Sequence, residues 1–162
     1  MLASAVALGV AAGLAFGGDW RRLARVRIRA WPLLAAAFAI RAVGFAVPLP
    51  PALYLAALAA IVAVALLNAR LPGALLVAFG TALNVAVIAL NGGMPVDAAA
   101  ALAAGAEQRV GDGLHVPLTD TTLLPFLADV IPVPLVRGVY SAGDVVIALG
   151  GFWLPFAALR RP

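Results

Sequence analysis

The chain contains no cysteine and no lysine, and only 11% of its 162 residues are charged. Without cysteine, neither a disulfide framework nor a thiolate metal site can form. A soluble domain carries about a quarter charged residues, and a globule with less polar surface could not cover itself in water. Because 65% of the residues are hydrophobic, the composition predicts a protein whose exterior is largely solvated by lipid.

Motifs for common enzyme chemistry are also missing. The sequence has no GxSxG, HExxH, phosphate-loop or dinucleotide-binding pattern, so no cofactor is expected. All eleven basic residues are arginine, alongside abundant alanine, glycine, valine and proline. This bias is typical of a bacterial genome rich in G and C, and it places the expected membrane in a bacterial cell.

Five apolar runs predict five membrane-crossing helices within a single domain covering residues 1–162. The runs cover about 2–17, 30–47, 52–67, 73–90 and 139–159. Prolines at 48, 50, 51 and 72 separate the second, third and fourth runs, because proline cannot continue a helix beyond its first turn. The predicted fold class is therefore an all-α transmembrane bundle.

The arginine distribution predicts the orientation, with the N-terminus outside and the C-terminus in the cytoplasm. The segments expected inside hold Arg21, Arg22, Arg25, Arg27, Arg29, Arg70, Arg160 and Arg161. Those expected outside hold Arg109 and Arg137 with the acids Asp97, Glu107, Asp112, Asp120 and Asp129. This asymmetry fits the positive-inside rule. The basic cluster at 21–29 is then a topology determinant that touches anionic lipid, and nucleic acid is not an expected partner.

Gly9, Gly13 and Gly17 recur four residues apart in the first run. This spacing allows close approach of another helix, either within the chain or in a membrane-protein partner or second copy.

The predicted outer segment, residues 91–138, begins with the turn signal Asn91-Gly-Gly-Met-Pro. Asp97 is expected to cap an interfacial helix that reaches about residue 108 or 109. The proline-rich stretch 115–134 is expected to form a re-entrant or interfacial segment.

Two acids are candidates for chemistry. Asp144 lies at the start of the last run, where a carboxylate is expensive and often functional. Ser141 and Asp144 also match a capping box, which would explain both structurally. Asp129 could share a polar site and one proton with Asp144, as in aspartyl hydrolases, or it could serve a turn.

Four further polar residues are candidates for lining the same site. Arg41 is the single cation within a predicted span, and it either extends to the interface or pairs with Asp129 or Asp144. Asn84 and Asn91 could line the site, although Asn84 could equally bond between helices. His115 is the sole histidine; it is a weak metal ligand candidate beside scattered acids and more typical of a surface residue.

Three motifs together resemble a bacterial membrane family of unknown function, domain of unknown function 5317. They are Asn91-Gly-Gly-Met-Pro, Leu127-Ala-Asp-Val-Ile-Pro and Ser141-Ala-Gly-Asp. The resemblance implies a bacterial membrane protein and no particular activity.

Asp129 and Asp144 are also distantly similar to the two acids of lipoprotein signal peptidase, although the asparagine that precedes the second acid in that family is absent here. Two hypotheses follow. The chain either binds a partner, lipid or small ligand at its outer face, or it is an aspartyl-type hydrolase that uses Asp129 and Asp144.

Overall fold

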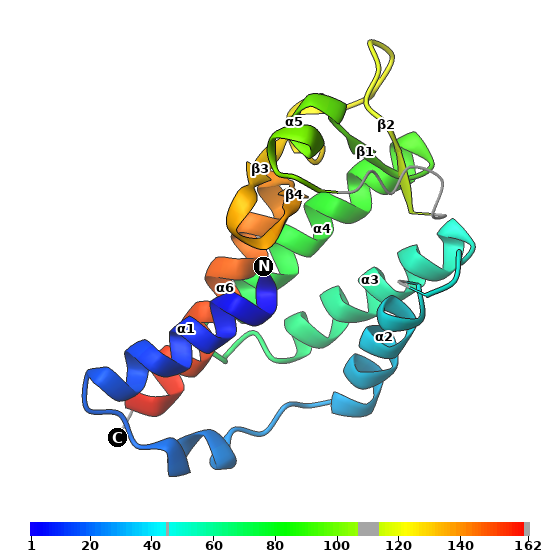
Figure 1. Ribbon diagram of the computed structural model, residues 1–162. Coiled ribbons are helices and arrows are strands. Elements are labelled where there is room, and N and C mark those ends of the chain that lie inside the picture. The colour runs from blue at the N-terminus through cyan, green and yellow to red at the C-terminus, as the bar shows by residue number, and fades with distance from the viewer. Residues whose placement is uncertain (45, 107–113, 161–162) are drawn as a thin grey trace.

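The computed structural model describes residues 1–44, 46–106 and 114–160, and the described chain is mostly helical (Figure 1). Its longest helices are α1 (Leu2–Ala15), α2 (Trp31–Val43), α3 (Pro51–Leu67), α4 (Ala74–Asn91) and α6 (Ala142–Arg160). Within the described ranges, α4 and α6 are long and apolar enough to cross a membrane, while α1, α2 and α3 are shorter apolar helices. Four residues of the charge argument, Glu107, Arg109, Asp112 and Arg161, lie outside the described residues.

Helix ends follow the glycine and proline signals, with three corrections. The second helix, expected to reach residue 47, ends at Val43, and the Tyr54 hydroxyl donates to the Gly44 carbonyl at 3.2 Å. The first ends at Ala15, before Gly17 turns the chain with a left-handed φ of 81°. The last begins at Ala142 instead of 139, because residues 138–140 form a strand.

The helices form a row in which each packs on its neighbour, in the order α2, α3, α4, α6, α1. Glycines permit the closest approaches. A Cβ atom at Gly9 would collide with the Phe152 carbonyl, and one at Gly13 with the Leu159 side chain. The glycine face of α1 therefore packs on α6 of the same chain; an additional role in oligomer formation stays a prediction.

The main apolar core lies among α2, α3 and α4. Its buried members are Ala37, Tyr54, Ala57, Leu58, Ile61, Val87, Ile88, Met94 and Leu114. Met94 and Leu114 come from the segment that joins α4 to α6, so this segment is attached to the helix core by apolar burial.

We call the described residues between α4 and α6, 92–106 and 114–141, the cap. It contains strands, so the all-α prediction is wrong here. Strand β1 (Met94–Val96) pairs in parallel with β2 (His115–Pro117), and β3 (Ile131–Val133) pairs antiparallel with β4 (Gly138–Tyr140). Single turns of 3-10 helix are η2 (Pro125–Leu127) and η3 (Pro134–Val136), and a longer one, η1 (Trp20–Arg25), precedes α2.

The cap also holds the short helix α5 (Ala98–Ala103). The Asp97 side chain accepts a hydrogen bond from the Ala99 amide at 2.8 Å, which confirms the predicted cap. The helix does not extend to about residue 108 as expected. It ends at Ala103, and Gly105 adopts a left-handed φ of 62°, a conformation that stops helix growth.

Candidate functional site

Three polar residues form a hydrogen-bonded network between α4 and the start of α6. Asn84 donates its amide N–H to Asp144 Oδ1 at 2.9 Å, and the buried Ser141 hydroxyl donates to Asn84 Oδ1 at 3.0 Å. The Ser141 amide donates to Asp144 Oδ2 at 3.3 Å, while the Asp144 amide donates to Ser141 Oγ at 3.0 Å. The capping box predicted from sequence is therefore present, and Asn84 extends it to a second helix.

Glycine makes this network possible. A Cβ atom at Gly143 would overlap the Asn84 side-chain oxygen and press on the Gly80 carbonyl, and one at Gly80 would meet the Gly143 carbonyl at 2.5 Å. The two backbones approach closely enough for a single asparagine to reach Asp144 across the helix pair.

Asp129 is fixed by the edge of β1. Its amide donates to the Pro95 carbonyl at 2.9 Å, and its carbonyl accepts from the Asp97 amide at 3.0 Å. Its carboxylate is buried, with Oδ2 3.9 Å from His115 Nε2. The other oxygen, Oδ1, has no hydrogen-bond partner among the described residues. A buried carboxyl with an unsatisfied oxygen favours its protonated form, because ionising it would leave a poorly solvated charge.

The electrostatic surroundings strengthen that preference. The pKa of Asp129 is raised from 3.8 to about 8, first by burial and then by the negative charge of Asp144, while the positive charge of Arg41 opposes both. Near neutral pH, Asp129 is therefore mainly a neutral acid that can donate a hydrogen bond. Arg41 acts on it through space, since no ion pair within 4.0 Å joins Arg41 to an acid in the described ranges.

Tyr140, which was not among the predicted site residues, belongs to the same polar region. Its hydroxyl accepts a hydrogen bond from the Met1 ammonium group at 3.3 Å. Burial, followed by the charges of Asp144 and Asp129, raises the pKa of this phenol. In the sequence, its position directly before Ser141, which caps α6, could have marked Tyr140 as a candidate.

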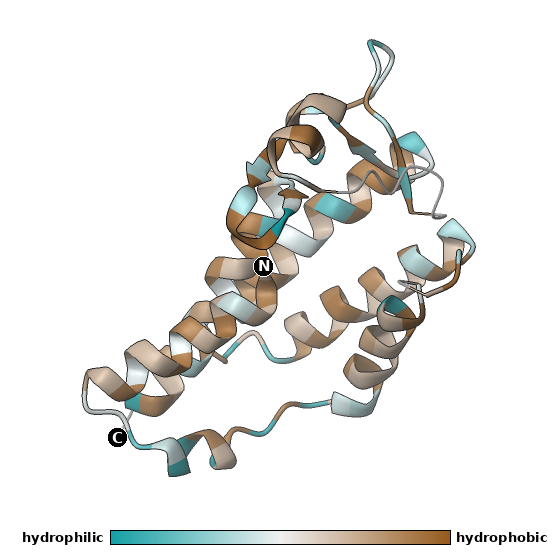
Figure 2. Cartoon of the chain, in the orientation of Figure 1, coloured by the Kyte–Doolittle hydropathy of each residue, from teal (hydrophilic) through white to brown (hydrophobic). Residues whose placement is uncertain are grey.

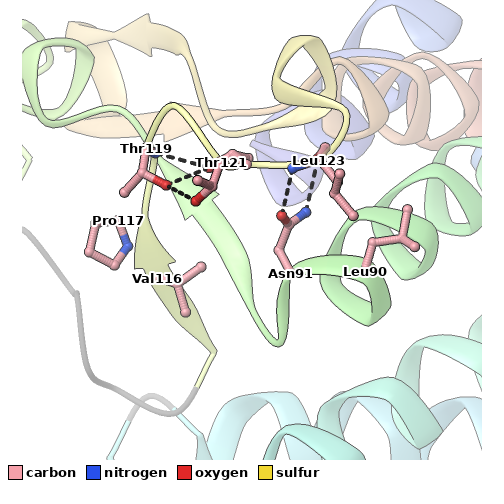
Figure 3. A pocket seen from close by; sticks show the side chains of 8 residues that line it. Leu90, Asn91, Val116, Pro117, Thr119, Thr121 and Leu123 are labelled. Atoms are coloured by element: carbon pink, nitrogen blue, oxygen red, sulfur yellow. Dashed lines mark hydrogen bonds between the residues drawn. The ribbon is translucent and has the colours of Figure 1, made fainter.

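Asn91, expected to line the acid site, has a different role. Its side chain donates to the Leu123 carbonyl and accepts from the Leu123 amide, both at 2.9 Å (Figure 3). It also donates to the Val87 carbonyl at 2.9 Å. Asn91 thus holds the cap onto the end of α4. It also borders a pocket of about 320 Å³, lined by Leu90, Asn91, Val116, Pro117, Thr119, Thr121, Thr122 and Leu123.

The structure therefore places the predicted site residues in separate groups. Asn84, Ser141 and Asp144 meet directly, and His115 lies beside Asp129. Asp144 and Arg41 influence Asp129 electrostatically. Within the described ranges, no group of three or more acids, histidines or cysteines is placed to hold a metal ion.

The sequence comparison adds a family assignment. A family model described as "Family of unknown function (DUF5317)" matches residues 25–156. The chain belongs to this family. No curated protein and no solved structure matches the chain, so the similarity to lipoprotein signal peptidase stays a hypothesis.

The DUF5317 region contains the complete candidate site. It extends from before Arg41 to beyond Asp144 and includes the whole cap, whereas α1 lies before it. The acids, their hydrogen-bond partners and the threonine-lined pocket are thus all contained in the family segment.

Proposed function

We propose that this chain is a multi-pass protein of the bacterial inner membrane that binds a partner, lipid or small ligand through its cap. In this proposal α1, α2, α3, α4 and α6 all cross the bilayer, with the N-terminus outside and the C-terminus in the cytoplasm. The observation that carries the proposal is the exposure of large apolar side chains along every one of these helices.

The exposed apolar surface is extensive. It includes Leu8 and Phe16 on and after α1, Trp31 and Phe38 on α2, Leu66 and Leu67 on α3, Leu75 and Phe79 on α4, and Leu149 and Trp153 on α6. Figure 2 shows hydrophobic colours along much of the helical chain. In water, each such side chain would forgo part of the about 1.5–3 kcal/mol that complete burial contributes. Lipid removes this penalty, so the same surface is expected on membrane helices.

The charges support one orientation. Six arginines at 21, 22, 25, 27, 29 and 70 lie in the α1–α2 and α3–α4 connections, which the Arg29–Asn68 hydrogen bonds hold together and which contain one acid, Asp19. The described part of the cap holds one arginine, Arg137, and the acids Asp97, Asp120 and Asp129. Under the positive-inside rule the cap faces the exterior.

Because the chain has no cysteine, single-cysteine labelling tests this topology directly. Cysteines at Thr121 in the cap and at Pro50 between α2 and α3 should react with a membrane-impermeant maleimide in intact cells. Cysteines at Val26 and Ala69 should react only after permeabilisation. Labelling of Ala69→Cys in intact cells, or protection of Thr121→Cys, would overturn the proposed orientation.

A binding role, rather than catalysis, is supported by the surroundings of the acids. Both oxygens of Asp144 accept hydrogen bonds from protein groups. Asp129 is only 6% exposed, and neither acid lines the threonine-lined pocket. A substrate would have to displace part of the cap before it could meet both carboxyls.

One observation favours the hydrolase as a second candidate. A neutral carboxyl at Asp129 beside the charge of Asp144 resembles the acid-and-base division of an aspartyl enzyme. In cells lacking the wild-type chain, Asp129→Asn and Asp144→Asn variants would then leave an uncleaved membrane substrate that wild type removes. The exposed Asp120→Asn is the matched control. Identical membrane peptide populations for wild type and both acid variants would eliminate the hydrolase.

A further inference from the structure

We propose that the tip of the β3–β4 hairpin, residues 134–137, binds the outer lipid surface by inserting Leu135 among the lipids and placing Arg137 at their phosphates. This inference rests on the proposed membrane location, and it names lipid as the ligand of one part of the cap.

The hairpin tip is unusually apolar for an exposed turn. Leu135 is 94% exposed, and Val136 and Ile131 are each more than a third exposed. From Ile131 to Val136 the sequence contains no polar side chain. Elsewhere on the cap, Leu102, Leu123 and Phe126 are exposed as single large apolar side chains, as is ordinary on protein surfaces. A continuous exposed apolar run needs a partner that removes it from water.

The backbone of the tip suits an environment with little water. Pro132 and Pro134 have no N–H group to satisfy, and the Arg137 amide donates to the Pro134 carbonyl at 3.1 Å. The two strands pair with each other in antiparallel fashion, Ile131 opposite Tyr140 and Val133 opposite Gly138, and this pairing uses backbone hydrogen-bonding groups of both strands. Few backbone donors would therefore lose hydrogen bonds on entering the lipid interface.

The hairpin also lies close to the ends of apolar helices, where a membrane surface is expected in the proposed topology. β4 leads through Ser141 directly into α6, and the Met1 ammonium at the start of α1 bonds to Tyr140 of β4. The tip therefore belongs to the region where two apolar helices begin (Figure 1). In the proposed topology this is the boundary between the outer leaflet and the periplasmic side.

The positive charge of Arg137 favours lipid over an apolar protein surface as the partner of the tip. Arg137 directly follows the apolar tip and is itself exposed. A guanidinium can bind a phosphate oxygen pair through two parallel hydrogen bonds. An apolar side chain beside an arginine thus matches the acyl-chain and phosphate layers of a bilayer surface.

The test uses the full chain reconstituted in vesicles of phosphatidylethanolamine and phosphatidylglycerol. Single cysteines replace Leu135, Thr121 or Phe79, and each carries an environment-sensitive NBD label. Leu135 and Thr121 are exposed and Phe79 is 59% exposed, so none of the three labels disturbs the core. We expect NBD at residue 135 to be quenched by lipids spin-labelled near the headgroup and protected several-fold from iodide. NBD at residue 121 should show the reverse.

Phe79, the sixth of the 18 residues of α4, distinguishes the two proposals. Quenching at residue 79 by deeply spin-labelled lipid, with residue 135 open to iodide, would overturn the hairpin inference and leave the membrane proposal intact. Iodide access at residue 79 would contradict the membrane proposal itself. Protection of residue 135 from both iodide and lipid quenchers would mean that protein covers the tip, which also overturns the lipid assignment.

Arg137 is tested separately by Arg137→Gln in the Leu135→Cys background. Headgroup quenching of the label should fall at least twofold in vesicles containing phosphatidylglycerol. Unchanged quenching would remove Arg137 from the proposed contact.

Discussion

Replacing Asp129 with asparagine should stabilise the protein at neutral and alkaline pH. Asparagine has nearly the shape of a protonated aspartic acid but cannot ionise. In the wild type, the pKa of this carboxyl is raised from 3.8 to about 8, mainly by burial and also by the charge of Asp144, against partial opposition from Arg41. The folded protein therefore bears a penalty at Asp129 once the unfolded chain can release this proton.

The sign and magnitude follow from proton linkage. Between pH 3.8 and about 8 the Asp129 carboxyl is protonated in the folded state and ionised in the unfolded state. Because the unfolded state binds fewer protons, the free energy of unfolding falls as pH rises through this window. At about 1.36 kcal/mol for each pKa unit, the whole penalty is on the order of 5 kcal/mol above pH ~8 and vanishes below pH ~4.

Thermal unfolding in detergent between pH 5 and pH 9 measures the effect. The melting temperature of Asp129→Asn should exceed that of the wild type by an amount that grows with pH, to roughly 10 °C at pH 9. Asp120→Asn removes the same charge from an exposed position and should not reproduce this trend. A difference between wild type and Asp129→Asn that stays constant with pH would refute the assignment of a raised pKa to this carboxyl.

Three further substitutions test the hydrogen-bond and packing arguments. Gly143→Ala should lower the free energy of unfolding by about 1–3 kcal/mol, because the added methyl overlaps Asn84. Chemical denaturation measures this change, and Val145→Ala at an exposed position of the same helix is the control. Asn91→Ala should increase the rate of amide hydrogen exchange in residues 119–124 at least tenfold, because it removes three hydrogen bonds. An unchanged exchange rate would show that Asn91 does not hold the cap. Asn68→Ala should increase proteolysis of the 26–30 connection, because the Asn68 amide group bonds both backbone groups of Arg29; equal cleavage of wild type and variant would contradict that role.

The long helices could be predicted because their signals are local. Their apolar runs are bounded by glycine or proline, as at Gly17, Pro48 and Pro72, and the boundaries in the structure lie within a few residues of the expected ones. The Ser141–Asp144 capping box and the Asp97 cap could be predicted for the same reason, because both use only neighbouring residues.

The cap could not be predicted from such signals. Its strands are three residues long, too short to show the alternation that identifies a strand. His115 and Asp129 come together because both segments lie against β1, and that pairing has no sequence signature. The turn motif at Asn91 predicted a site-lining residue there, but its hydrogen bonds to Leu123 depend on where a loop distant in sequence returns to the end of α4.

The order of the helices in space has a consequence for biosynthesis. Of the described helices, α6 leaves the ribosome after α1 to α5, yet it lies between α1 and α4. While α2, α3 and α4 can assemble with their sequence neighbours as they emerge, α1 has no partner until translation reaches α6. The glycine faces of α1 and α4 stay uncovered during that interval. Arrival of α6 then completes both the row of described helices and the polar network of Asn84 in a single step.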